Sequence, residues 1–345
     1  SVGIDENISN GVKFEGASRY PASDWSSYGV YVSDQYRVHQ KVTLQAGLRY
    51  NHFMLNAAFD TTYYPFPFTE AKLNNGSVTG SFGLVYRPSK TWVLSANFGT
   101  AFRAPNVDDV GKVFDSEPGA VTIPNPNLQA EYAYNVDVSI AKVFSDVIKL
   151  DLTGYYTILT DALVRRDFTL NGQDSIVYAG ELSQVQAIQN AAVATVYGLQ
   201  AGVEVKLPLG FGFASDFNWQ VGREELDNGE VSPSRHAAPW FGVSRLTYRY
   251  KALSLQLNAQ YSGAVKNENL PEEEKGKTEI YAKDANGETW SPSWYTINFK
   301  ASYQFLHNFT VSAGIENLTD IRYRPYSSGI VAPGRNFILS VKASF

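Results

Sequence analysis

The connections between strand-like segments are the feature that most constrains the fold of this sequence. Segments in which apolar and polar residues alternate predict β-strands, and about 13 clear segments, with a weaker one near the start, follow this pattern. Six short connections alternate with six long ones without a break. The short connections are 38–41, 87–91, 144–148, 206–212, 249–253 and 305–309, and the long ones are roughly 59–77, 103–130, 168–190, 226–239, 265–293 and 320–335.

This alternation of connection lengths indicates a membrane barrel. In an up-and-down antiparallel meander, it places every short turn at one end of the strands and every long loop at the other. Outer-membrane barrels have this asymmetry, with short periplasmic turns and long external loops. Soluble sandwiches also contain alternating strands, but they have no reason to keep this order. We therefore predict an all-β fold, a transmembrane antiparallel β-barrel with about 14 strands in this sequence.

The two faces of the predicted strands differ as a barrel in lipid requires. In the segment LSLQLNAQY, one face carries Leu253, Leu255 and Leu257, and the other carries Ser254 and Gln256. A polar face suits a water-filled lumen and would be costly in a dry core. Aromatic residues gather near strand ends, as in the girdles of membrane barrels, although core aromatics of a sandwich are the alternative interpretation. The sheet must close, because unpaired backbone groups at an edge are unfavourable in hydrocarbon.

Composition and motifs argue against several classes of function. The 345 residues carry a net charge of −5 and contain no cysteine, so the sequence has neither the excess of basic residues typical of nucleic-acid binding nor a thiolate site. The four histidines do not have the spacing of a zinc site. No GxSxG motif marks a hydrolase nucleophile. We therefore expect neither enzymatic activity nor a nucleic-acid partner.

Several motifs, taken together, carry a family resemblance. FRAP (102–105) opens the loop 103–130 and NPNL (125–128) closes it. The chain ends with GIENLTDIRYRPY (314–326) and a last strand that finishes in phenylalanine, and SYGVYVSDQYRVHQKVTLQAGLRYNHF (27–53) is typical of paired strands in mid-barrel. Together these features resemble the TonB-dependent outer-membrane receptors, and the resemblance covers nearly the whole chain.

The resemblance implies energised nutrient uptake across the outer membrane of a Gram-negative bacterium. Ligand would bind to the external loops, and the TonB–ExbB–ExbD system would act through a plug domain inside the barrel. Barrels of this kind have 22 strands. Residues 1–345 are therefore expected to form the C-terminal portion of such a barrel in membrane lipid, without a plug domain. A second chain or fragment is expected to complete the barrel.

Two other functions stay open on the sequence alone. A self-contained 14-strand barrel would act as a channel for passive diffusion, since an even strand number is allowed. A structural or adhesion barrel would carry its function in the loops 265–293 and 103–130. An upstream plug would favour the receptor, whereas conductance by this chain alone would favour the channel.

The ligand class is not resolved among siderophores, haem, cobalamin, oligosaccharides and peptides. A histidine in the loop between FRAP and NPNL would resemble the haem receptors of this family. Residues 107–124 contain no histidine, so this specific argument for haem is absent, although haem is not excluded. The candidate ligand-binding residues lie in external loops and at the tops of strands. They are Arg103, Asn106, Asp108, Asp109, His236, Trp240, Tyr281 and Trp290.

Several of these candidates have a structural alternative. Arg103 is expected to clamp the base of its loop, through backbone carbonyls or a carboxylate, in preference to binding ligand. Trp240, Tyr281, Trp290 and Trp294 are able to stack on a sugar or siderophore ring, but girdle positions are the structural interpretation.

Acidic residues in the loops raise two further hypotheses. Asp108, Asp109, Asp115 and Glu117 offer oxygen ligands of the kind that calcium takes, although their spacing matches no known calcium loop. No other cofactor is expected. The charge cluster PEEEKGKTE (271–279) predicts a solvated loop tip, with a cation or ligand contact as the alternative.

Overall fold

A computed structural model describes residues 7–9, 12–14, 20–60, 66, 68–111, 114–117, 119–178, 180–226, 229–235 and 237–344. Among these residues, thirteen long strands form one antiparallel wall, which confirms the predicted barrel fold. They are β3 (Ala22–His39), β4 (Val42–Ala58), β5 (Glu70–Tyr86), β6 (Trp92–Arg103), β9 (Glu131–Phe144), β10 (Ile148–Asp167), β12 (Glu181–Lys206), β13 (Phe211–Glu225), β15 (Phe241–Tyr250), β16 (Leu253–Ser262), β19 (Trp294–Leu306), β20 (Phe309–Glu316) and β21 (Asn336–Ala343).

Shorter elements accompany these long strands, and some of them pair with strands of the wall. β1 (Asn7–Ser9) and β2 (Val12–Phe14) form a separate hairpin. The long loops contain α1 (Val107–Gly111), β7 (Phe114–Glu117), β8 (Ala120–Ile123), β11 (Ser175–Tyr178), β14 (Val231–Pro233), η2 (Asn267–Asn269), η3 (Glu272–Glu274), β17 (Ala282–Lys283) and β18 (Thr289–Trp290), and η1 (Pro208–Gly210) lies in a short turn. No helix in the described part of the chain is long and apolar enough to cross a bilayer.

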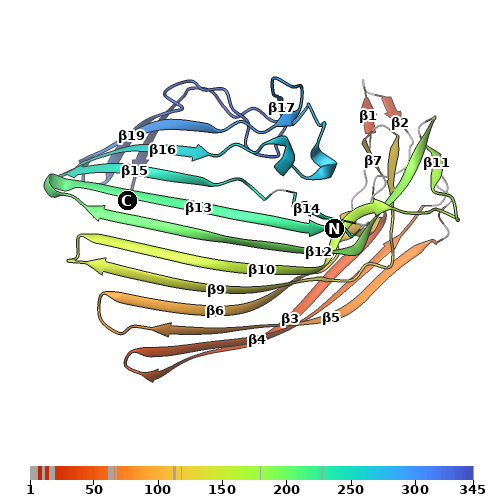
Figure 1. Cartoon of the computed structure of the whole chain (residues 1–345), viewed down its shortest axis with the longest axis horizontal. Coiled ribbons are helices and arrows are strands. Elements are labelled where there is room, and N and C mark those ends of the chain that lie inside the picture. The colour runs from red at the N-terminus through yellow and green to blue at the C-terminus, as the bar shows by residue number, and fades with distance from the viewer. Residues whose placement is uncertain are drawn as a thin grey trace.

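The short turns and the long loops lie at opposite ends of the wall, as the sequence predicts (Figure 1). Two of the long loops are shorter than expected, because β5 begins at Glu70 and β12 at Glu181. Leu73 on β5 and Val185 on β12 are buried in these extensions. Their burial comes from packing against folded loops, and strand formation that depends on such contacts is not visible in the local pattern.

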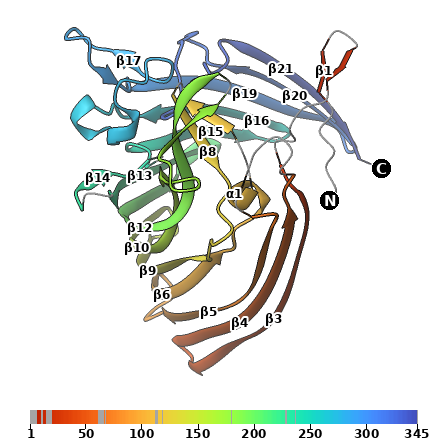
Figure 2. The same ribbon diagram turned by 90° about the vertical axis from the view of Figure 1, so that its right-hand side faces the viewer.

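The first and last strands of the wall, β3 and β21, differ from the others because each pairs with a neighbouring strand on one side only among the described residues. β3 and β21 form the two edges of the curved wall and lie apart in Figure 2, and we call the interval between them the seam. Among the described residues, β3 forms a ladder with β4, β21 forms one with β20, and no ladder joins β3 to β21. Ladders join every other pair of neighbouring wall strands. Unpaired backbone groups at a seam are costly in lipid.

The strand register separates an apolar face from a polar one. Leu257 of β16 lies opposite Leu246 of β15 and Phe299 of β19. Its chain neighbour Asn258 lies opposite Asn298, whose Nδ2 donates to Asn258 Oδ1 at 2.9 Å. Asn258 also lines a cavity inside the barrel. The apolar face therefore points outward to lipid and the polar face lines the lumen, as the alternation predicts.

The loop between β6 and β9 folds into the mouth of the barrel. Figure 2 shows α1 within the curve of the wall. Val110 of α1 belongs to one buried cluster with Phe53 and Leu55 of β4 and with Leu128. β8 pairs in parallel with residues 184–187 of β12. The loop is thus partly regular in structure and fixed to the wall on both sides.

Candidate functional site

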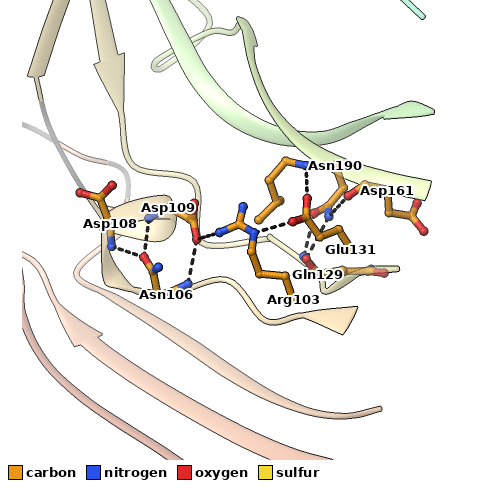
Figure 3. A network of polar contacts seen from close by, with 9 residues as sticks. Arg103, Asn106, Asp108, Asp109, Gln129, Glu131, Asp161 and Asn190 are labelled. Atoms are coloured by element: carbon orange, nitrogen blue, oxygen red, sulfur yellow. Dashed lines mark hydrogen bonds and ion pairs between the residues drawn. The ribbon is translucent and has the colours of Figure 1, made fainter. Parts of the chain in front are cut away.

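Arg103 holds the loop that FRAP opens and NPNL closes (Figure 3). It is the last residue of β6, and it donates from Nη1 to Asp109 Oδ2 at 2.8 Å and from Nε to Glu131 Oε1. Asp109 lies in α1, whereas Glu131 begins β9. One guanidinium therefore joins the helix to both strands that flank the loop. These contacts match the predicted structural role of Arg103, a clamp at the loop base that binds a carboxylate.

Asn106 fixes the start of α1. Its Oδ1 accepts from the backbone N–H of Asp108 at 2.8 Å and of Asp109 at 3.1 Å. Asp109 Oδ2 in turn accepts from the N–H of Asn106 at 3.0 Å. This arrangement satisfies N–H groups that a helix start leaves free. Asp108 Oδ1 accepts from the hydroxyl of Tyr20 at 2.9 Å, so all four predicted residues of this loop make contacts within the protein.

Asn190 connects the far end of the same loop to the wall. Its Oδ1 accepts from the N–H of Gln129 at 2.7 Å, and its Nδ2 donates to the carbonyls of Gln129 and Asp161 at 2.9 Å each. Glu131 Oε2 accepts from the N–H of Leu163. The register between β10 and β12 shifts at this height, next to Leu163. Asn190 was not predicted, because a bulge between distant strands leaves no local mark in the sequence.

The acidic residues of this loop are the predicted calcium ligands. In the described part of the chain, no three histidine or acidic side chains gather in a way that would hold a metal ion. Asp108 and Asp109 are engaged as described above, and the side chains of Asp115 and Glu117 lie outside the described residues. Calcium binding stays a prediction.

A second network joins three external loops around one buried carboxylate. Glu274 is 0% exposed. Its Oε1 accepts from Arg235 Nε and from Ser327 Oγ, each at 3.0 Å, and its Oε2 accepts from the hydroxyl of Tyr281. The donors come from the loops 226–240, 263–293 and 317–335. A buried carboxylate needs such pairing, since burying an unpaired charge is strongly unfavourable.

The prediction of a solvated tip for residues 271–279 is therefore wrong at Glu274. Its neighbour Glu272 is exposed and forms an ion pair with Lys275, as a solvated segment would. The three donors to Glu274 lie elsewhere in the sequence, two of them in other loops. A local run of charges does not reveal which carboxylate such donors will surround.

The remaining candidate residues lie apart from one another. Tyr281 is 3% exposed and its hydroxyl is bound to Glu274. The ring of Trp240 lies beside those of Phe217 and Tyr261, with centroids 6.1 and 6.2 Å away, on the outward face of the wall. This position matches the girdle interpretation.

The structure says less about the remaining two candidate residues, Trp290 and His236. Trp290 belongs to β18, and its buried Nε1 has no hydrogen-bond partner among the described residues. His236 lies outside the residues that the structure describes. No contact among the described residues joins Trp290 to Arg103 or to the Glu274 network.

A large cavity lies inside the barrel next to the Glu274 network. Its volume is about 810 Å³, and inward polar side chains such as Gln200, Asn218 and Arg245 line it. Tyr326 and Trp294 line it as well. Cavities of this size hold small-molecule ligands in many proteins.

Alkaline pH is expected to loosen the Glu274 network. Burial, and then the hydrogen bond to Glu274, raise the pKa of Tyr281 above its ordinary value of 10.0. Burial, and then the charge of Glu274, raise the pKa of Tyr326 to about 12. A group with a raised pKa stabilises the fold fully below its unfolded value, and this contribution is lost as pH rises through the folded pKa.

Amide protection in the loop 263–293 should therefore hold up to pH 10.0 and fall above it. Hydrogen-exchange protection factors, corrected for the intrinsic rate at each pH, measure this effect. A Tyr281→Phe variant should lose less protection on the alkaline side, whereas Tyr295→Phe, on the outward face, should behave as the parent protein. Constant protection through this pH range would show that the two phenols do not stabilise the network.

Comparison with known proteins adds to this geometry. Residues 4–318 match the family model described as TonB dependent receptor-like, beta-barrel. The chain is 22% identical over 378 residues to the Hemoglobin-haptoglobin utilization protein B of Neisseria meningitidis, covering 96% of this chain and 45% of the relative. It is 23% identical over 349 residues to the Hemoglobin-haptoglobin-binding protein A of Haemophilus influenzae, covering 86% and 32%. The chain spans less than half the length of these curated relatives.

Solved structures show the same fold. The copper transporter OprC superposes with a TM-score of 0.72 at 15% identity, covering 94% of this chain and 48% of that chain. Similarity at this level of identity shows the fold alone. The family model, by contrast, matches far more than half of the chain. The chain therefore belongs to the TonB-dependent receptor β-barrel family, the transport receptors of the bacterial outer membrane.

Proposed function

We propose that the protein to which this chain belongs imports haem iron from haemoglobin-type proteins in a TonB-dependent manner. The observation that carries the proposal is the extent of the match to the two haemoglobin-binding relatives. Their matches cover 96% and 86% of this chain, and therefore most of its external loops. External loops are the part of such a barrel that meets a ligand from outside the cell.

Energised import would require a plug domain in addition to the wall of the barrel. A plug domain within the lumen, remodelled by the TonB–ExbB–ExbD system, is the coupling element that the family membership suggests. The polar wall of the 810 Å³ cavity offers a surface for contact with such a domain. The plug domain and the TonB system are proposed partners of the whole protein.

The seam supports a larger barrel. β3 and β21 each have a ladder on one side only among the described residues, and lipid offers no hydrogen bonds to the other side. We propose that further strands, from a second chain or another segment, pair with both edges to complete a 22-strand barrel. The self-contained passive channel would instead require β3 and β21 to pair directly.

Haem recognition would not use a described histidine as a ligand to iron. His39 is the last residue of β3 and His307 lies in the turn between β19 and β20, both at the end opposite the external loops. His52 shares the outward face of β4 with Tyr50, whose hydroxyl lies 3.3 Å from His52 Nδ1. Binding through the porphyrin ring and its propionates is the chemistry that the described external residues support.

Growth on haemoglobin as the only iron source tests the proposed ligand. A strain with the natural gene should grow, and a strain in which the gene is deleted should not, while both grow equally on an iron salt. Restoration of growth by the natural gene completes the comparison. Equal growth of the deletion strain on haemoglobin would overturn the proposal, and a growth defect confined to a ferric siderophore would assign a different ligand.

A further inference from the structure

A second cavity lies among the external loops, and we call it the outer pocket. It has a volume of about 360 Å³, within the range of small-molecule sites, and is formed by the loops 263–293 and 317–335 together with Trp294 at the top of β19. Trp294 and Pro325 also line the luminal cavity. The outer pocket therefore borders the luminal cavity at these two residues.

The charged lining of the outer pocket is entirely basic. Arg322 and Arg324 are the only charged residues that line it among the described residues. Arg324 is held in place, because Nη1 donates to the carbonyls of Glu279 at 2.9 Å and Ile280 at 3.1 Å. Arg322 is exposed, and within the described part of the chain it has neither an ion pair nor a side-chain hydrogen bond. The site is thus cationic in a protein whose net charge is −5.

Two features of the guanidinium group define what Arg322 would bind. Its planar fork of N–H donors matches the two oxygens of a carboxylate, and it forms charge-assisted hydrogen bonds that are stronger than neutral ones. Two arginines facing one small pocket repel each other when it is empty of anions, and an anion between them removes that repulsion. The electrostatics of the pocket therefore favour an anionic ligand.

Aromatic rings supply the other half of the site. The rings of Trp294 and Tyr323 stack with centroids 4.2 Å apart and an interplanar angle of 28°. Both residues line the outer pocket, beside hydroxyl side chains such as Ser291 and Ser293. A stacked pair presents an apolar surface on which a flat conjugated ring packs well.

We propose that the outer pocket binds a planar conjugated molecule through a carboxylate on Arg322 and a ring face on the Trp294–Tyr323 pair. Haem propionates and aromatic-acid siderophores share this chemistry. At 360 Å³, the pocket would take the carboxylate-bearing edge of a porphyrin rather than the whole ring. The inference deepens the proposed function, and it rests on that function where the ligand is taken to be haem.

Binding measurements on the whole natural protein in detergent test the pocket. The probes are haemin, iron octaethylporphyrin, which has the same ring system without carboxylates, and the ferric complex of 2,3-dihydroxybenzoate. The affinity of haemin should fall about tenfold or more in Arg322→Gln, the loss expected for one charge-assisted hydrogen bond. Arg322→Lys should lose part of the affinity, because an ammonium keeps the charge but not the fork.

Lys283→Gln is the matched control, because Lys283 is an exposed residue of the loop 263–293 that does not line the outer pocket. It should leave haemin affinity unchanged, and iron octaethylporphyrin should bind the parent and Arg322→Gln with the same weak affinity. Since Arg322 makes no contact that folding requires, heat-modifiable mobility on gels should be the same for every variant. Measurable haemin binding with the same affinity in Arg322→Gln and in the parent protein would overturn the pocket proposal.

The outcomes also separate the pocket from the proposed function. If growth on haemoglobin depends on the gene but haemin affinity does not depend on Arg322, the function stands and the pocket proposal fails. If only the ferric dihydroxybenzoate complex binds, and does so through Arg322, the pocket proposal stands and the haem assignment fails. If no probe shows a dependence on Arg322, the pocket proposal is wrong whatever the ligand.

Discussion

Replacing Glu274 with glutamine is expected to loosen three external loops at once. The carboxylate accepts hydrogen bonds from Arg235, Tyr281 and Ser327, and these come from three different loops. Removing one partner of a buried ion pair typically costs about 3–5 kcal/mol. Arg235 keeps 37% of its side chain exposed and stays partly hydrated. We therefore expect the free energy that holds the loops closed to fall by about 2–3 kcal/mol.

Hydrogen exchange measured by mass spectrometry on the protein in detergent tests this expectation. Because 1.4 kcal/mol is a factor of ten, local opening of the loops 263–293 and 317–335 should become about 30- to 150-fold more frequent. Glu272→Gln is the matched control: its side chain is 58% exposed, and exposed ion pairs contribute about 0–1 kcal/mol. If the opening frequency of Glu274→Gln increases only in the loop 263–293, Glu274 does not link the loops.

Replacing Arg103 with glutamine is expected to release the loop 104–130 from the barrel mouth. The substitution leaves Asp109 and Glu131, with side chains 14% and 13% exposed, without the cation between them. Truncating one partner of such hydrogen-bonded pairs costs about 2–5 kcal/mol. Because the Arg103 side chain is 45% exposed, we expect the free energy that holds the loop closed to fall by about 2 kcal/mol. Arg103→Lys should rescue little, because a single ammonium does not reproduce the fork that reaches two carboxylates.

Hydrogen exchange in residues 104–130 without ligand measures the release of this loop. We expect about 30-fold faster opening for Arg103→Gln, from the same energy-to-rate conversion. Lys72→Gln is the control, because Lys72 pairs with Glu70 on the surface, with about 60% of each side chain exposed. If exchange without ligand is unchanged in Arg103→Gln, Arg103 is not a clamp, and the alternative role in ligand contact gains support.

The wall of the barrel can be predicted from the sequence, because the alternation of side chains between the two faces of a strand and the lengths of the connections are visible in short stretches of sequence. Leu257 and Asn258 lie on opposite faces as their alternation predicts. The starts of β5 and β12 were misplaced, since Leu73 and Val185 are buried by loops that arrive from elsewhere in the chain. Contacts of that kind depend on the tertiary fold and leave no period in the sequence.

The candidate site was predictable only in part. Arg103 was identified because FRAP stands at a loop edge, and its partner Asp109 lies 6 residues away. Glu274 was misjudged because Arg235 and Ser327 are 39 and 53 residues away. The outer pocket depends likewise on Arg322, in the loop 317–335, lining the same cavity as Trp294 of β19, and the sequence alone does not pair these residues.

Energised uptake is the central claim, and accumulation of radioactive iron from haemin tests it most directly. Cells that carry the whole natural protein should accumulate the label, and deletion of tonB or addition of a protonophore should reduce accumulation to that of cells lacking the receptor gene. Binding of haemin at the cell surface should be the same with and without tonB. Accumulation that persists in the absence of TonB and of the proton gradient would contradict the account and would identify the barrel as a passive channel.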